Sequence, residues 1–190
     1  MSKKLTPKFL QESRENLSKM IVYSRFAQKF KRRNARRRNC LQRLHCLRLI
    51  DIFQKLYLAN YPIEKIRLVD EYNADDELSM RDNNSSCFNF RYVSHTNRIS
   101  KHGYGLAVDI NPLYNPYIKF VNGKKSIEPA NAAEFEDRAK NYPYKIVEGD
   151  LCHKLFTDNG FLWGGNCWKE ELDYQHFFIP DGFTENGEPR

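Results

Sequence analysis

The chain has 190 residues, of which 41% are hydrophobic and 14% aromatic, enough for one globular domain with a core of its own. No apolar run approaches the roughly 20 residues that span a bilayer, so we expect no transmembrane segment. The net charge of +7 is uneven along the chain. Residues 1–50 hold 15 Lys or Arg and two acidic residues, whereas residues 51–190 hold 16 and 22.

The N-terminal 40 residues carry most of the positive charge. Six of the eight residues from Lys31 to Arg38 are Lys or Arg. Such a run can bind phosphate groups, lie on an anionic membrane surface or remain a solvated tail. Aromatic residues do not alternate with these arginines, so the pattern disfavours nucleic-acid binding. We expect residues 1–40 to form a basic tail or helix that folding does not require, and residues 41–190 to form the domain.

The first predicted element of the domain is an amphipathic helix. Apolar residues recur from Leu41 to Tyr57 at spacings of three and four, the period of a helix with one buried face. The helix should end at Asn60-Tyr61-Pro62, because proline disfavours a helical conformation in the residue before it. Residues 63–71 then predict a strand, and the polar residues 73–86 predict a loop.

The rest of the chain predicts short strands and short helices. A strand is expected over 105–111, and Asn-Pro pairs interrupt the chain after it. Short helices are expected over 134–140 and 149–159, the second ending at Asn159-Gly160, and a last strand over 174–179. This order predicts an α+β fold with a small antiparallel sheet flanked by helices.

Asp109 is the first candidate functional residue. It follows Val108 and precedes Ile110, in an apolar run where a carboxylate is costly to bury without a partner. His102 lies seven residues earlier, in the stretch "SKHGYGLAVDINP". On these residues alone, either a metal cation or backbone N–H groups in a turn could compensate the charge of Asp109.

A second group lies in "DYQHF", residues 173–177. Residues three apart on a strand point to opposite faces, so Asp173 should lie at a bend or before the strand that carries His176. Two imidazoles and one carboxylate can fill three corners of a tetrahedron and leave the fourth open, the usual form of a catalytic zinc site. The alternative is that His176 is simply a half-buried strand residue.

Taken together, these motifs resemble those of the D-alanyl-D-alanine carboxypeptidase/dipeptidase and L-alanyl-D-glutamate endopeptidase family, the VanX/VanY-like zinc peptidases. The stretch "SKHGYGLAVDINP" is similar to the family's SxHxxGxAxDI signature, and "DYQHF" to its second motif. "NNSSCFNFR", residues 83–91, resembles the segment that ends in the family's active-site arginine. "FLWGGNCW", residues 161–168, resembles the segment that precedes the second motif.

The resemblance implies a hedgehog/DD-peptidase fold and a set of roles. His102, Asp109 and His176 would hold one zinc ion per chain. Asp173 would be the general base that takes a proton from the attacking water and delivers it to the leaving amine. Arg91 would bind the carbonyl oxygen or the oxyanion that develops from it, with Arg81 and Arg98 as the competing arginines.

The resemblance also implies a function, hydrolysis of peptide bonds in peptidoglycan stem peptides by carboxypeptidase or endopeptidase action. The alternative is a catalytically silent, zinc-bearing binding domain whose basic arm contacts an anionic partner. Asp173 favours the enzyme, because a domain used only for binding needs no base beside the metal. We expect a monomer acting at the bacterial cell wall or in the periplasm, although no signal peptide is visible. The motifs leave open which peptide bond is cut.

Overall fold

The computed structural model describes residues 39–94, 96–168 and 171–180. The basic extension expected over 1–40 lies almost wholly outside these residues, so its separation from the domain stays a prediction. Within the described ranges, no helix is long and apolar enough to cross a membrane.

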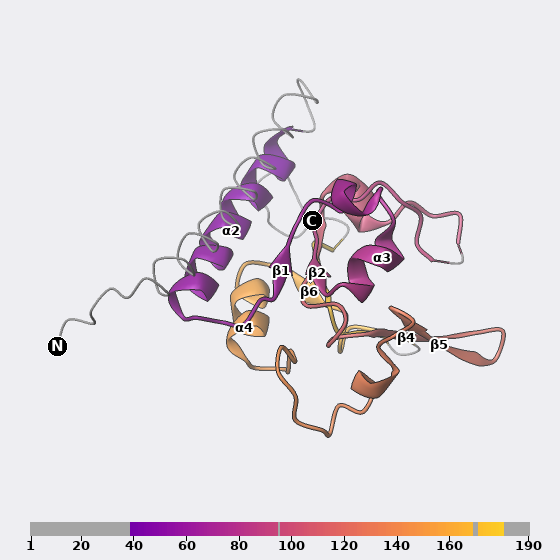
Figure 1. Ribbon diagram of the computed structural model, residues 1–190. Coiled ribbons are helices and arrows are strands. Elements are labelled where there is room, and N and C mark those ends of the chain that lie inside the picture. Colours follow the sequence, from indigo (N-terminus) through magenta and orange to yellow (C-terminus); the bar gives the residue numbers. More distant parts are fainter. Residues whose placement is uncertain (1–38, 95, 169–170, 181–190) are drawn as a thin grey trace.

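One long helix, α2, and a series of short helices and strands make up the described part of the chain (Figure 1). The α-helices are α2 (Asn39–Leu58), α3 (Asp76–Arg81) and α4 (Leu151–Thr157), and the 3-10 helices are Val69–Tyr72, Lys101–Tyr104 and Ala133–Phe135. The strands are β1 (Lys65–Ile66), β2 (Asn84–Ser85), β3 (Ala107–Asp109), β4 (Tyr117–Val121), β5 (Lys124–Glu128), β6 (Leu162–Trp163), β7 (Leu172–Asp173) and β8 (His176–Phe178).

Helix α2 follows the predicted amphipathic pattern. One face buries Leu49, Ile52, Phe53 and Leu56 in the core. Phe53 meets Phe156 of α4 edge to face, with ring centroids 6.2 Å apart. Burying each such side chain stabilises the fold by about 1.5–3 kcal/mol. The helix ends where Asn60 turns to a φ of 53° ahead of Pro62, so its predicted end is confirmed.

The strands form two small antiparallel sheets and one parallel pair. One sheet has the order β3-β8-β6, the other has the order β5-β4-β7, and β1 pairs with β2 in parallel. Residues 174 and 175 form the turn between β7 and β8, so this turn joins the two antiparallel sheets. The predicted α+β class with small antiparallel sheets is confirmed.

The β4–β5 hairpin is absent from the sequence-based prediction. It closes through Asn122 and Gly123, both with positive φ (51° and 74°), and pairs Val121 with Lys124. Asn-Gly is the strongest short signal for a two-residue hairpin turn, and it was present in the sequence. In Figure 1 the hairpin extends away from the rest of the domain.

Three other expectations were wrong in part. The strand expected over 63–71 has two residues, β1, followed by a 3-10 helix. The loop expected over 73–86 contains α3 and β2, because the Asp75 side chain accepts a hydrogen bond from Leu78 N (3.0 Å) and caps α3. The helix expected over 134–140 is a 3-10 turn over Ala133–Phe135. The helix expected over 149–159 is present as α4.

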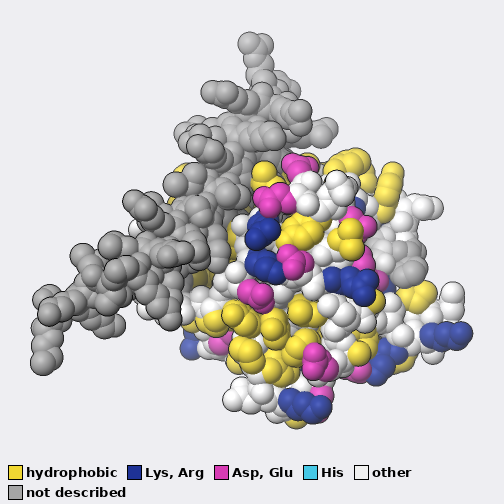
Figure 2. All heavy atoms as spheres, viewed as in Figure 1, with side chains coloured by type: hydrophobic (Ala, Val, Ile, Leu, Met, Phe, Trp, Pro, Cys, Tyr) yellow, Lys and Arg dark blue, Asp and Glu magenta, His cyan; other side chains and the backbone are white. Residues whose placement is uncertain are grey.

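Charges of both signs share the described surface. In Figure 2, Lys and Arg side chains lie beside Asp and Glu side chains across the visible face, with apolar side chains between them. Several of these charges are paired, such as Lys65 with Asp82 at 2.6 Å. Exposed pairs of this kind contribute about 0–1 kcal/mol each, so stability depends mainly on the buried core.

Candidate active site and metal centre

His102 and Asp109 reach the site from one continuous segment. His102 lies on the 3-10 helix Lys101–Tyr104, which Ser100 caps by accepting a hydrogen bond from His102 N (3.3 Å). The chain then enters β3, and Asp109 is the last residue of that strand. The strand predicted over 105–111 is therefore present but shorter.

Strand pairing brings His176 to the other two residues. Asp109 of β3 is paired in register with His176 of β8, and the two side chains meet at 2.8 Å between Asp109 Oδ1 and His176 Nδ1. Asp173 lies at the end of β7, before the turn into β8, as the spacing of three had predicted.

The three side chains form one buried cluster. His102 Nε2 lies 3.2 Å from His176 Nδ1 and 3.0 Å from Asp109 Oδ2. His102 is 1% exposed, Asp109 2% and His176 9%. Two histidines and a carboxylate thus point one atom each at a common centre, and this group could hold a metal ion.

A hydrogen bond on the side of His102 away from the cluster determines which ring nitrogen carries the proton in the neutral ring. His102 Nδ1 lies 2.6 Å from the carbonyl oxygen of Cys87. A carbonyl only accepts, so Nδ1 carries the proton and, in the neutral ring, Nε2 presents its lone pair to the cluster. Metal-binding histidines are commonly oriented by such a bond.

The donor set fits zinc. Zinc takes imidazole nitrogen and carboxylate oxygen at about 2.0–2.2 Å in tetrahedral geometry, which places ligand atoms about 3.3 Å apart. Here the two imidazole nitrogens lie 3.2 Å apart, and each lies 2.8–3.0 Å from one of the two carboxylate oxygens of Asp109. Three protein ligands leave a fourth position for substrate or water, as in catalytic sites.

The charge of Asp109 is compensated by side chains. Burial opposes ionisation, but in their protonated forms His102 and then His176, through their charges and hydrogen bonds, hold the pKa of Asp109 below its usual range. Arg91 lies farther away, with its Nη2 atom 3.9 Å from Asp109 Oδ2.

Asp173 faces the same pocket with an unsatisfied carboxylate oxygen. Its Oδ1 is buried and has no hydrogen-bond partner among the described residues. Burial raises the pKa of the Asp173 carboxyl to about 7; the nearby charges of His176 and Arg91 oppose that shift, whereas Asp109 adds to it. A carboxyl group with this pKa can both accept and release a proton near neutral pH.

The first glycine of "FLWGGNCW", Gly164, allows this placement of Asp173. Asp173 N donates to Gly164 O (2.9 Å), and Gly164 N donates to His176 O (2.8 Å). A Cβ at Gly164 would lie 2.6 Å from Asp173 O and 2.9 Å from Asp173 Cβ, closer than such atoms approach. Only glycine lets the chain at residue 164 pack against both Asp173 and His176.

Arg91 is held at the edge of the cluster by a residue that the sequence analysis missed. Its Nε lies 2.9 Å from Asp76 Oδ2, and Asn89 Nδ2 donates to the other carboxylate oxygen of Asp76 at 3.2 Å. Asp76 belongs to α3, in the segment expected to be a loop. The Asp75-Asp76-Glu77 run is typical of a helix N-terminus and could have revealed the helix, but not the partner.

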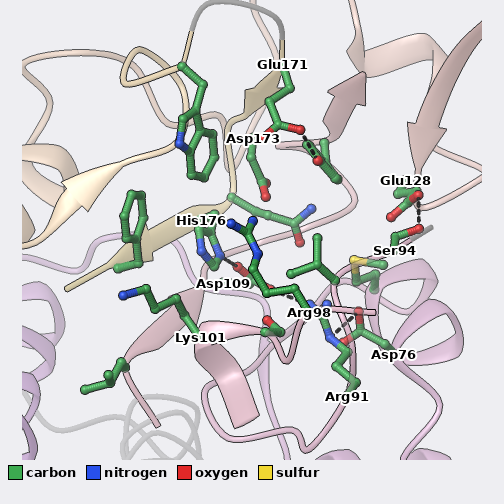
Figure 3. A pocket seen from close by; sticks show the side chains of 18 of the residues that line it. Asp76, Arg91, Ser94, Arg98, Lys101, Asp109, Glu128, Glu171, Asp173 and His176 are labelled. Atoms are coloured by element: carbon green, nitrogen blue, oxygen red, sulfur yellow. Dashed lines mark hydrogen bonds and ion pairs between the residues drawn. The ribbon is translucent and has the colours of Figure 1, made fainter. Parts of the chain in front are cut away.

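A pocket of about 500 Å³ opens over the cluster. Figure 3 shows Asp109, Asp173, His176, Arg91 and Arg98 around it. Arg98 is exposed and lines the pocket, whereas Arg81 is exposed on α3 and is not among the lining residues. The structure thus brings two of the three candidate arginines to the site. The pocket is lined by Asp76, Met80, Arg91, Val93, Ser94, Arg98, Ser100, Lys101, Tyr104, Leu106, Asp109, Tyr117, Glu128, Trp168, Glu171, Asp173, Gln175, His176 and Phe178.

The comparison with known families agrees with the motifs. A family model described as D-alanyl-D-alanine carboxypeptidase matches residues 94–179. No curated protein and no solved structure matches the chain. The match contains His102, Asp109, Asp173 and His176 and begins after Arg91. Residues 94–179 are therefore similar to the D-alanyl-D-alanine carboxypeptidase family, which confirms the resemblance that the motifs predicted.

Proposed function

We propose that this chain is a zinc-dependent peptidase that hydrolyses peptide bonds in peptidoglycan stem peptides. One observation carries the proposal: the cluster of His102, Asp109 and His176 shares a pocket with Asp173, whose buried Oδ1 has no partner among the described residues. The family match supports a peptidase role. Because the substrate lies there, we place the site of action at the bacterial cell wall.

His102, Asp109 and His176 would hold the zinc ion. When bound, zinc supplies a Lewis acid that makes water nucleophilic near neutral pH and polarises a carbonyl group. The protein's part is to orient His102 through the bond from Nδ1 to Cys87 O, so that Nε2 faces the other two ligands. The Asp109 carboxylate is kept ionised by the two histidines.

Asp173 is assigned the role of general base and then acid. Its carboxylate would accept a proton from the attacking water and return that proton to the amine that leaves. A pKa of about 7 suits both transfers, because general acid–base catalysis works best when the pKa lies near the working pH.

Arg91 is assigned the role of stabilising the oxyanion that develops from the substrate carbonyl. Its guanidinium lines the pocket, and its Nη2 atom lies 3.9 Å from Asp109 Oδ2. The ion pair to Asp76 uses Nε and holds the guanidinium beside the pocket. A fixed cation placed where negative charge develops lowers the barrier without reorganising during the reaction.

The test is digestion of purified muropeptides by the zinc-loaded protein, with products identified by mass. Loss of a terminal D-alanine would indicate a carboxypeptidase, and cleavage within the stem an endopeptidase. Asp173→Asn, loaded with zinc to the same level, is the matched control and should leave the peptides nearly intact. If wild type binds zinc and muropeptides but cuts none of them, the catalytically silent binding domain is the correct reading.

A further inference from the structure

Gln175 presents an unsatisfied group to the same pocket. It lies in the turn between β7 and β8, two residues after Asp173 and next to His176. The side chain is 2% exposed and lines the pocket, and its oxygen Oε1 has no hydrogen-bond partner among the described residues. The backbone holds the residue in place, since Ile110 N donates to Gln175 O at 3.0 Å.

Two donors on the pocket wall are already engaged elsewhere. Tyr117 donates its hydroxyl hydrogen to Glu171, and Ser94 Oγ donates to Glu128 at 2.8 Å. A buried acceptor without a donor is disfavoured, so the donor for Gln175 is expected from a molecule that enters the pocket.

The chemistry of Gln175 indicates which donor. Asp109, Asp173 and Glu171 already line the pocket with carboxylates, and these suffice to attract a cation. A neutral carboxamide adds a directional acceptor without further negative charge beside the general base. Its natural partner is a neutral N–H, the group that every peptide bond of a substrate offers.

We propose that Gln175 Oε1 accepts a hydrogen bond from a non-scissile backbone N–H of the peptide substrate. This inference rests on the proposed peptidase function and adds a binding residue to it. Because Gln175 is two residues from Asp173, the bond would fix the register of the peptide and thereby select which peptide bond lies beside the base.

The experiment pairs a variant with a change in the substrate. The probe is the synthetic stem pentapeptide L-Ala–γ-D-Glu–L-Lys–D-Ala–D-Ala, with a series of analogues in which one N–H at a time is replaced by an ester oxygen. Release of product at the bond that is cut gives kcat/KM for each peptide. The variants are Gln175→Met, which keeps an unbranched side chain of similar length but removes the acceptor, and Gln54→Met on exposed α2 as matched control.

In wild type and in Gln54→Met, one ester replacement away from the scissile bond should lower kcat/KM by about 10- to 100-fold. On the all-amide peptide, Gln175→Met should have a kcat/KM lower than that of wild type by a similar factor. Gln175→Met should cleave that ester analogue with the same kcat/KM as the all-amide peptide. Zinc content should match wild type. If Gln175→Met discriminates amide from ester as wild type does at every position, solvent satisfies Gln175 and the proposal is wrong.

A second variant and a binding measurement test the proposal even if Gln175→Met misfolds or the protein shows no activity. Gln175→Glu keeps an acceptor oxygen and should retain the amide-to-ester ratio, whatever its absolute rate. In zinc-loaded Asp173→Asn, the Gln175 side-chain N–H resonances should shift when the pentapeptide is added, and an unchanged spectrum with peptide bound would contradict the proposal. If wild type binds the peptide and Gln175 responds while no bond is cut, the peptidase function fails and the binding role survives.

Discussion

The site has two halves that are held in different ways. The histidine–aspartate half is positioned by strand register, since Asp109 of β3 and His176 of β8 are direct partners in one sheet, and its side chains are almost fully buried. The arginine half is positioned by an ion pair between half-buried side chains, Arg91 on an irregular segment and Asp76 on α3.

This difference indicates which half tolerates change. A residue in the first half is locked by backbone hydrogen bonds and by burial, so its loss leaves a charged or polar group without compensation. A residue in the second half is oriented by one contact that solvent partly reaches, and such contacts are individually weaker. We therefore expect the loss of activity on mutation to be largest at the metal ligands and smallest at Asp76, which contacts Arg91.

Removal of a ligand should have the largest effect. We expect His102→Ala to lose stoichiometric zinc and essentially all activity, because one nitrogen of a three-ligand site is gone and Asp109 loses a compensating partner. Elemental analysis and peptide hydrolysis measure both. His153→Ala is the control, since His153 lies on α4 outside the cluster. Full zinc content in His102→Ala would remove His102 from the site.

Removal of the general base should lower activity less than removal of a ligand does, and the zinc should stay bound. We expect Asp173→Asn to keep zinc and lose about 10²–10⁴-fold in kcat, the usual contribution of general acid–base catalysis. Glu171→Gln is the matched control, because Glu171 lines the same pocket but accepts a hydrogen bond from Tyr117. Near-normal turnover by Asp173→Asn would assign the proton transfer to another group.

Removal of the arginine tests the second half directly. We expect Arg91→Ala to lower kcat by about 10²-fold, the scale of losing one preorganised oxyanion donor, with zinc content and melting temperature near wild type. Arg91→Lys should recover only part of the rate, because a point charge does not reproduce the planar guanidinium. Arg81→Ala should be nearly silent, since Arg81 does not line the pocket. The reverse result would assign the role to Arg81.

The same contrast explains how far the sequence led. The stretch from Ser100 to Asn111 and the DYQHF motif each combine ligand residues with a recognisable local strand pattern. The cluster and the position of Asp173 before β8 were therefore predictable. The amphipathic helix α2 was predictable from its apolar period. These features depend on residues close together in sequence, or on strands whose pairing the motifs require.

What the sequence did not reveal depends on contacts between distant segments. The sequence analysis did not single out Asp76, which lies in a polar stretch. Its role depends on a contact with Arg91, fifteen residues away, and the sequence does not show that contact. The features that single out Gln175 are its burial and its missing partner among the described residues, and the sequence shows neither. The β4–β5 hairpin had its Asn-Gly signal, but its strands mix exposed and half-buried residues and lack a clear apolar alternation.

The smallest expected effect is at Asp76, which acts only through Arg91. Asp76→Asn keeps an oxygen for Arg91 Nε but removes the charge of the 2.9 Å ion pair, so the guanidinium should be less firmly oriented and kcat should fall about 10-fold or less. The decisive measurement is the double variant. If Asp76 is a positioning residue, Asp76→Asn should have almost no further effect in the Arg91→Ala background, because residues that act through one contact are not additive. Asp82→Asn, on the same part of the chain but paired with Lys65 and Tyr72 outside the pocket, should leave kcat unchanged. An equal loss in both backgrounds would mean that Asp76 acts on the site independently of Arg91.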